Sequence, residues 1–326
     1  MLTSNEIAAS FETYLGRLEY SKPPMNLYAP IEYVLSNGGK RLRPTLLALA
    51  YNMYCDDSQV ESCFDAAAGI EIFHNFTLLH DDLMDRASVR RGNPTVHCKW
   101  NDNTAILSGD GMLVLAYRQL AQAAGDKLQE VMAIANGTFT GIMEGQQYDM
   151  DFESRSDVSE QEYMEMIRLK TSVLLAASAQ MGAVLGGADR KDAELLYSFG
   201  EKLGLAFQLQ DDLLDVYGDP AVFGKKIGGD ILCNKKTFMY INACRLADPE
   251  QKRELDRWAQ YDGNDPDSKI AAVTSIYDAV GVRQLATDLI ADYFDQALAM
   301  LDRVSLPESR KVEMKAYAGS LLDRKQ

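Results

Sequence analysis

The same acidic pattern, Asp-Asp-X-X-Asp, occurs twice in this chain of 326 residues. It occupies residues 81–85 (DDLMD) and 211–215 (DDLLD), and each copy follows a strongly apolar run that is typical of a helix. Residues four apart share a helix face, so the first and last aspartates of each copy point the same way. Each copy comes near the predicted end of its helix, where the macrodipole disfavours negative charge. The two acidic pentads are therefore better explained by a function than by local stability.

Paired carboxylates repel each other unless cations lie between them. Hard oxygen ligands suit Mg²⁺, which binds one or two protein carboxylates and completes its octahedral shell with water and phosphate oxygens. The pentads therefore predict a metal-dependent site for a phosphorylated substrate. The formal net charge of −15 argues against general nucleic-acid binding, so an anionic substrate needs local basic groups. Short basic clusters occur at Lys40/Arg41/Arg43, Arg90/Arg91, Lys225/Lys226 and Lys235/Lys236.

Helical periodicity dominates the rest of the sequence. Stretches rich in Ala, Leu, Met and Glu recur, whereas alternating β-branched runs between turn residues are hard to find, which predicts an all-α bundle. We expect a single domain over residues 1–326, because no linker of low-complexity composition interrupts them. The expected helices cover residues 5–18, 27–36, 42–54, 60–84, 102–122, 127–148, 160–186, 191–215, 236–246, 250–260, 268–279 and 282–303. The longest break, residues 218–234, predicts a functional loop.

The cysteines and the apolar segments bear on where the protein works. The five cysteines show no CxxC spacing, so neither a zinc ribbon nor a disulfide framework is indicated, and a reducing cytoplasm is expected. The N-terminus lacks the basic and apolar regions of a signal peptide. Residues 171–188 are uncharged but contain Ser172, Ser178 and Gln180, so we expect a helix buried in the bundle and no transmembrane segment.

Helical projection adds one polar residue to each pentad. His74 lies seven residues before Asp81 and almost in line with Asp81 and Asp85. Gln208 takes the corresponding place above the second pentad. A single polar residue above a carboxylate stripe is more often a satisfied core group, but beside two metal pentads a place in the site is favoured.

Several short motifs follow one another in a characteristic order. They are residues 38–44 (GGKRLRP), 80–85 (HDDLMD), 90–97 (RRGNPTVH), 170–171 (KT), 207–215 (FQLQDDLLD), 224–230 (GKKIGGD) and 235–237 (KKT). The series, over roughly residues 30 to 240, resembles the trans-isoprenyl diphosphate synthases. GGKRLRP or RRG alone is a weak signal, whereas the ordered series is specific.

The resemblance implies an isoprenoid synthase-type helical bundle around a central cavity, a homodimer, and head-to-tail condensation of isopentenyl diphosphate with an allylic diphosphate. It implies three Mg²⁺ ions on the allylic diphosphate, with the ligands Asp81, Asp85 and Asp211 and the supporting residues Asp82, Asp212 and Asp215. It assigns to the allylic diphosphate the cations Arg90, Lys170, Lys225 and Lys235. It assigns to isopentenyl diphosphate the residues Lys40, Arg43, His74 and Arg91.

The remaining implied roles concern the reacting atoms. Thr171 and Gln208 are neutral dipoles that would face the allylic cation, where a fixed positive charge would be unfavourable. No protein base is obvious in the sequence. In this family the released pyrophosphate is thought to take the final proton.

Two other functions use part of the same pattern. A class I terpene cyclase also ionises a prenyl diphosphate with a DDxxD helix, but it usually carries an Asn/Ser/Glu-type second metal motif and lacks the clamp for a second diphosphate. A non-catalytic partner subunit of a synthase typically loses pentad aspartates or the flanking arginines. This chain keeps both pentads and the basic residues, which favours chain elongation.

Product length is the finer question. In the family, the positions five and four residues before Asp81 set the length, and here they are Phe76 and Thr77. An aromatic residue followed by a small one resembles geranylgeranyl (C20) synthases, with a farnesyl (C15) or a longer polyprenyl product as the alternative. Helix geometry alone does not favour Phe76 over Phe73 as the residue that closes the tunnel. The floor of the tunnel can also be set from other helices, through Met112, Ile142 or Met143.

Overall fold

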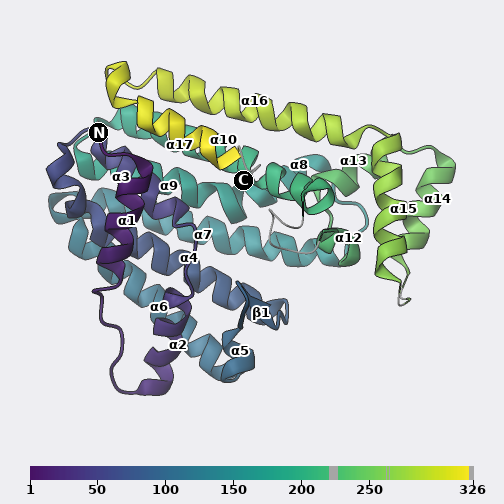
Figure 1. Cartoon of the computed structure of the whole chain (residues 1–326), viewed down its shortest axis with the longest axis horizontal. Helices are drawn as coiled ribbons and strands as arrows, with labels where there is room; N and C mark the ends of the chain where they lie inside the picture. Colours follow the sequence, from purple (N-terminus) through teal and green to yellow (C-terminus); the bar gives the residue numbers. More distant parts are fainter. Residues whose placement is uncertain (220–226, 262, 264, 323–326) are drawn as a thin grey trace. The chain divides into compact units, whose positions relative to one another are not determined.

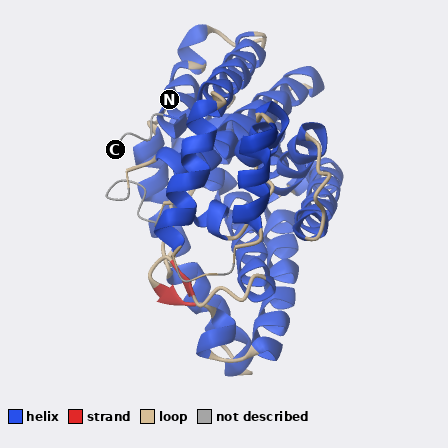
Figure 2. Cartoon of the chain, turned by 90° about the vertical axis from the view of Figure 1, so that its right-hand side faces the viewer, coloured by secondary structure: helices blue, strands red, loops and turns tan. Residues whose placement is uncertain are grey.

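The computed structural model describes residues 1–219, 227–261, 263 and 265–322. Within them the chain is almost wholly helical (Figure 1), and the described residues contain a single pair of strands, β1 (Val89–Arg90) and β2 (Asn93–Pro94), drawn in red in Figure 2. The all-α class predicted from the periodicity is confirmed. Lys225 of the expected site and its neighbour Lys226 lie outside the described residues.

The helices keep the labels of Figure 1. They are α1 (Ser4–Leu15), α2 (Met25–Ser36), α3 (Leu42–Asn52), α4 (Phe64–Met84), α5 (Val96–Lys99), α6 (Asp102–Ala123), α7 (Leu128–Glu153), α8 (Glu160–Ile167), α9 (Val173–Gly186), α10 (Arg190–Tyr217), α12 (Gly229–Leu232), α13 (Phe238–Leu246), α14 (Pro249–Ala259), α15 (Pro266–Ala279), α16 (Val282–Asp302) and α17 (Val312–Leu322). Short 3-10 turns occupy Asp57–Cys63, Gly125–Lys127 and Glu308–Arg310.

Each helix expected from the sequence is present among the described residues, with one difference in kind. Residues 160–186 do not form one regular helix, because a π-helical turn, Arg168–Ser172, separates α8 from α9. Helix α17 is not expected from the sequence, and neither are the four-residue helices α5 and α12, which are too short to show a period.

The chain forms two compact units, and it passes between them several times. Unit 1 contains Met1–Asn136, Ala177–Leu196 and Ser305–Met314, and unit 2 contains Gly137–Ala176, Tyr197–Val304 and Lys315–Gln326. The first pentad belongs to unit 1 and the second to unit 2. The expectation of one domain over residues 1–326 stays a prediction.

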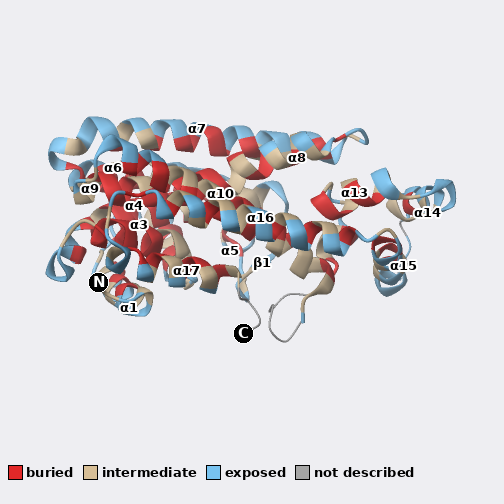
Figure 3. Cartoon of the chain, turned by 90° about the horizontal axis from the view of Figure 1, so that it is seen from above, coloured by how far each residue is buried: buried red, intermediate tan, exposed pale blue. Residues whose placement is uncertain are grey.

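In unit 1, α4 is the central helix. It packs along α6 and also contacts α1, α2, α3 and α5. Both α3 and the first two thirds of α4 are densely buried, as their red colour in Figure 3 shows. The burial ends toward the pentad, where Asp81 is half-buried and Asp85 is exposed. The core therefore holds α4 firmly and leaves its last turn accessible.

In unit 2, one apolar cluster joins α8, α10 and helices α13 to α16. Tyr163 on α8, Phe238 on α13 and Tyr277 on α15 are each about fully buried in it. Because burial of a large side chain contributes roughly 1.5–3 kcal/mol, this cluster fixes the part of α10 that carries the second pentad.

The segment Glu160–Gly186 has the length and composition of a helix that could cross a membrane. In its most apolar window, 72% of the residues are buried inside the structure. Core helices of globular proteins have the same property, and this agrees with the buried helix expected for the uncharged stretch.

Candidate active site

The first pentad divides its carboxylates between two directions. Asp82 is buried, and its Oδ1 accepts a hydrogen bond from Arg90 Nε at 2.7 Å. Burial raises the pKa of Asp82, and the positive charge of Arg90 opposes that effect. Arg90 Nη2 also lies 3.5 Å from Asp81 Oδ2. Asp81 and Asp85 lie one turn apart on the accessible side of the helix, as the spacing predicts.

The strands β1 and β2 form a hairpin that sends two adjacent arginines in different directions. Arg90 pairs with Asn93 across the hairpin and points to the first pentad. Arg91 follows in the left-handed backbone conformation, with φ 51°, and its Nη1 donates to the carbonyl oxygen of Gly38. The hairpin thus connects the pentad to the loop that precedes α3.

Arg43 on α3 and His74 on α4 are in direct contact. Arg43 Nη1 donates to His74 Nε2 at 3.2 Å, which requires that nitrogen to be unprotonated. Burial lowers the pKa of His74 well below its ordinary value, and the charges of Arg43 and Arg91 lower it further. Lys40 is exposed on the same loop. Unit 1 therefore brings Arg43, His74 and Arg91 together in one basic region, and Lys40 lies on the loop that precedes α3.

The second pentad repeats the division seen in the first. Asp212 is buried and accepts hydrogen bonds from the Tyr163 hydroxyl and, at 3.1 Å, from Gln208 Nε2. Burial, with a further contribution from the charge of Asp230, raises the pKa of Asp212 to about 8. Asp211 and Asp215 are only half-buried. In both pentads the second aspartate turns inward to a protein partner, and the first and last remain accessible.

Asp215 also organises the chain that follows α10. Its Oδ2 accepts from the backbone N–H of Asp230 at 3.0 Å, within the first turn of α12. The Asp230 carbonyl in turn accepts from the backbone N–H of Lys235 at 2.9 Å. Lys235 is exposed just beyond this helix. The second pentad and Lys235 are thus joined by two hydrogen bonds.

Lys170 and Thr171 both lie in the π-helical turn. Lys170 Nζ is 2.6 Å from Asp149 Oδ2 on α7, and Thr171 Oγ1 donates to Gln208 Oε1 at 3.0 Å. The turn can approach α7 closely because residue 145 is glycine, and any Cβ there would collide with the backbone of Lys170. Single π turns inside helices frequently occur at functional sites, since the extra residue redirects the side chains.

Two residues that contact the predicted ligands are not themselves among the site residues predicted from the sequence. Asp149 pairs with Lys170, and Tyr163 donates to Asp212. Residues 145–149 (GQQYD) resemble a family motif, but the sequence assigns no role to Asp149. Tyr163 carries no signal, because its contact exists only through the packing of α8 against α10.

A polyprenyl synthetase family model matches residues 24–278, which is well over half of the chain. The chain belongs to the polyprenyl synthetase family. Geranylgeranyl diphosphate synthase of Methanosarcina mazei is 45% identical over 222 residues, which are 68% of each chain. That of Sulfolobus acidocaldarius is 38% identical over 285 residues, or 86% of this chain and 84% of the relative. A crystal structure of a geranylgeranyl pyrophosphate synthase matches with a TM-score of 0.94 at 40% identity and covers 100% of both chains.

Membership confirms the resemblance drawn from the ordered motifs. This polyprenyl synthetase is a prenyltransferase, a trans-isoprenyl diphosphate synthase with the all-α isoprenoid synthase fold. Its reaction is the short-chain condensation of prenyl diphosphates. The family model covers every motif of the series, from the loop before α3 to Lys235 and its neighbours.

The residues expected to limit product length lie on two sides of α4. Thr77 is half-buried on the face that carries His74 and Asp81. Phe76 is buried and contacts the rings of Phe73, at a centroid distance of 5.5 Å, and His80, at 4.8 Å. Of the positions expected on other helices, Met112 and Ile142 are buried, whereas Met143 is exposed.

The pentads of this polyprenyl synthetase fit Mg²⁺ by their donor chemistry. Over the described residues, no group of three or more His, Cys, Asp or Glu side chains forms a ready-made metal site. Mg²⁺ does not need one, because it takes one or two carboxylates and fills the shell with water and phosphate oxygens. Accessible aspartates one turn apart, such as Asp81 and Asp85, supply that kind of incomplete shell.

Proposed function

We propose that this enzyme condenses isopentenyl diphosphate with allylic diphosphates in a reaction that depends on three Mg²⁺ ions, and that its main product is geranylgeranyl diphosphate. The observation that carries the proposal is the presence of two different kinds of anion site. Acidic pentads flanked by cations suit a metal-bound diphosphate, whereas Arg43, His74 and Arg91 form a second region that is mainly basic, in which Arg43 contacts a buried histidine. Two substrates with diphosphate groups need two such sites.

The allylic diphosphate is assigned to the two pentads with Arg90, Lys170 and Lys235. Mg²⁺, when bound, neutralises the charge that develops on pyrophosphate as the carbon–oxygen bond breaks. Arg90 serves this site in two ways, since it holds Asp82 at 2.7 Å and remains beside Asp81. Lys225 lies outside the described residues, and its assignment to the same group is carried over from the sequence.

Thr171 and Gln208 are proposed to face the allylic cation. Their mutual hydrogen bond of 3.0 Å fixes the Thr171 hydroxyl and the Gln208 amide relative to each other. Both are neutral, so they can orient a dipole toward positive charge without the repulsion that a fixed cation would bring. Gln208 also donates to Asp212, which holds the amide in one orientation.

Isopentenyl diphosphate is assigned to Lys40, Arg43, His74 and Arg91. A neutral His74 accepts from Arg43, so the arginine is oriented before the substrate arrives. No general base is assigned, and pyrophosphate is proposed to take the final proton.

The C20 product rests on Phe76 and Thr77 and on the names of the relatives. Thr77 is a small residue on the helix face that carries Asp81, and the buried rings of Phe76 and Phe73 contact each other on the neighbouring face. The farnesyl (C15) product and longer products remain the alternatives.

A homodimer and a cytoplasmic location are also proposed. Within unit 1, α6 carries three apolar side chains that are strongly exposed in the single chain, Ile106, Leu107 and Val114. An exposed apolar row of this kind is typical of a surface that a second subunit covers. All five cysteines are described and none forms a disulfide, which suits a reducing compartment.

Two-substrate kinetics test the assignment of the anion sites. Arg43→Ala should raise the KM for isopentenyl diphosphate by about 10- to 150-fold, because one hydrogen bond to a charged group contributes roughly 1.5–3 kcal/mol, and should leave the allylic KM nearly unchanged. Lys235→Ala should act mainly on the allylic substrate or on turnover. The exposed residues Arg17 and Lys252 provide matched controls as Arg17→Ala and Lys252→Ala. Equal effects of Arg43→Ala and Lys235→Ala on both substrates would instead indicate one shared diphosphate pocket.

A further inference from the structure

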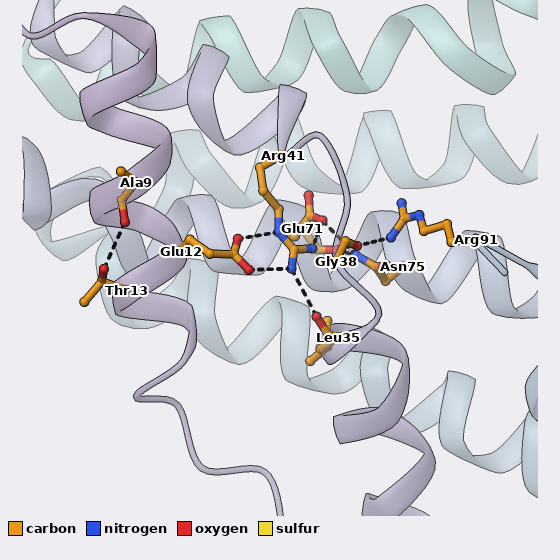
Figure 4. A network of polar contacts seen from close by, with 9 residues as sticks. All are labelled: Ala9, Glu12, Thr13, Leu35, Gly38, Arg41, Glu71, Asn75 and Arg91. Atoms are coloured by element: carbon orange, nitrogen blue, oxygen red, sulfur yellow. Dashed lines mark hydrogen bonds and ion pairs between the residues drawn. The ribbon is translucent and has the colours of Figure 1, made fainter. Parts of the chain in front are cut away.

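Arg41 differs from the two basic residues beside it, because its side chain is turned into the protein. Only 5% of Arg41 is exposed, whereas Lys40 is exposed to solvent. The guanidinium donates to Glu12 through Nε at 2.9 Å and Nη2 at 3.2 Å, to Glu71 through Nη1 at 2.7 Å, and to the Leu35 carbonyl at 3.1 Å (Figure 4). An arginine has five N–H donors, and protein acceptors occupy four of them. Arg41 is therefore committed to the protein and not to a diphosphate.

The backbone at Arg41 also departs from the ordinary. Its φ is 48°, in the left-handed region, and the next residue begins α3. A non-glycine residue in this region is strained and persists where its surroundings impose it. The four side-chain hydrogen bonds supply that constraint. They hold the residue that directly precedes α3, two residues before Arg43.

The loop that ends at Arg41 contains the residues that Arg91 contacts, Gly38 and Gly39. The Gly38 carbonyl accepts from Arg91 Nη1, and the Arg91 guanidinium lies so close to Gly39 that a Cβ there would be 2.9 Å from Nη1. Burial lowers the pKa of Arg91, and the negative charge of Glu71 opposes this. Glu71 precedes His74 by one turn of α4 and is 2% exposed, and its Oε1 also accepts from Asn75 at 3.0 Å. Arg41 therefore borders the loop that binds Arg91, and its partner Glu71 lies one turn from His74 on α4.

The network reaches helix α1 as well. Glu12 lies on α1, which precedes residues 24–278 matched by the family model. Both carboxylate oxygens of Glu12 bind Arg41 (Figure 4). The N-terminal helix is thereby connected, through one guanidinium, to the loop that holds Arg91.

We propose that Arg41, held by Glu71 and Glu12, is a positioning residue that sets the loop before α3 so that Arg43 and Arg91 are in place for isopentenyl diphosphate. Helix α1 then contributes to substrate affinity through Glu12, although it carries no substrate ligand. The inference rests on the proposed assignment of Arg43, His74 and Arg91 to isopentenyl diphosphate.

The test is two-substrate kinetics on Arg41→Met, which keeps an unbranched side chain and removes every donor. The KM for isopentenyl diphosphate should rise by about 10-fold or more, and the allylic KM should change by less than about 2-fold, because the hydrogen bonds lost support only the first of these sites. Arg41→Lys should restore part of the affinity, since one ammonium can reach a carboxylate but cannot bind Glu12, Glu71 and Leu35 together. Equal rises in both Michaelis constants, or no rise in a folded variant, would overturn the proposal.

Two further variants keep the test decisive if Arg41→Met does not fold. Removing Arg41 alone leaves Glu71 buried without its counter-charge, so the double variant Arg41→Met/Glu71→Met removes the pair together. Glu12→Ala leaves the buried pair intact and should raise the KM for isopentenyl diphosphate by roughly 3-fold or more, since it deletes two hydrogen bonds at the protein surface. The exposed residue Glu19 provides the control Glu19→Ala, which should change neither constant. A wild-type KM in Glu12→Ala and the double variant would refute the positioning role.

Arg43→Ala tests the assignment of isopentenyl diphosphate to this site independently of the positioning role of Arg41. If Arg43→Ala leaves the KM for isopentenyl diphosphate unchanged, the assignment of the site is wrong, and the positioning role is wrong with it. If Arg43→Ala raises that KM and Arg41→Met does not, only the positioning role is wrong.

Discussion

The protonation of His74 offers a prediction whose magnitude follows from the structure. An ordinary histidine has a pKa of about 6.5, so roughly 90% of it is protonated at pH 5.5. His74 is instead surrounded by arginines, with Arg43 Nη1 at 3.2 Å, and burial together with the charges of Arg43 and Arg91 lowers its pKa well below that value. We expect the pKa of His74 in the free enzyme to lie well below 6.5, so that less of it is protonated at pH 5.5 than of an ordinary histidine.

The same shift makes stability depend on pH in a definite direction. Between the lowered pKa of folded His74 and the ordinary value of about 6.5, the unfolded chain binds more protons than the folded one, so the free energy of unfolding rises with pH in this range. Lowering the pH from 7.5 to 5.5 should therefore remove up to about 1.4 kcal/mol of stability through this residue. His74→Gln should abolish that contribution, because glutamine does not titrate.

The measurement is NMR of the ring carbons and protons of labelled histidine. The chain has 3 histidines, and the His74→Gln spectrum identifies the His74 signals by their loss. In the free enzyme the titration midpoint of His74 should lie well below that of an ordinary histidine. Addition of inorganic pyrophosphate should raise this midpoint, because its negative charge offsets that of the arginines. A midpoint at about 6.5 or higher without ligand would show that the described arginine environment is wrong.

Three other changes test separate parts of the structure. Asp81→Ala or Asp211→Ala should lower turnover by about 10³-fold or more, because each change leaves a metal and its phosphate oxygens without a ligand. Circular dichroism should show that the protein keeps its fold. Near wild-type turnover at saturating Mg²⁺ would contradict the metal assignment. Tyr163→Phe should lower the free energy of unfolding by roughly 1–3 kcal/mol, since buried Asp212 loses a hydrogen-bond donor. The control Tyr148→Phe, at an exposed position, should have little effect. Equal effects of the two changes would show that the hydrogen bond from Tyr163 to Asp212 does not stabilise the fold. Phe76→Ala should lengthen the product by about one isoprene unit or more, because the vacated volume favours burial of a longer tail at about 0.8 kcal/mol per CH₂; an unchanged product would place the floor of the tunnel at other residues such as Met112.

The sequence predicts the helices well because their apolar faces repeat over many turns. The break between α8 and α9 escapes this reasoning, since Arg168–Ser172 contains neither proline nor glycine and one extra residue in a turn barely alters the period. The helix geometry also predicts that Asp81 and Asp85 share an accessible face. It does not reveal that Asp82 and Asp212 turn inward, because their partners Arg90 and Tyr163 are brought to them by tertiary packing.

Arg41 is another residue whose role the sequence alone does not reveal. In the sequence it belongs to a basic cluster with Lys40 and Arg43, and nothing in the composition separates the three. A left-handed backbone and two carboxylates from distant helices turn Arg41 inward, and these are features that only the folded chain defines. Contacts over 29 and 30 residues of sequence separation decide which cations remain for substrate.

The central claim is that this prenyltransferase extends an allylic diphosphate with isopentenyl diphosphate as far as C20. The most direct measurement is to incubate the purified enzyme with Mg²⁺, labelled isopentenyl diphosphate and each allylic primer in turn, and to determine the chain length of the products. The account predicts incorporation of label that requires both Mg²⁺ and an allylic primer, with geranylgeranyl diphosphate as the main product. Absence of incorporation, or a main product of C15 or of C30 and longer, would contradict it.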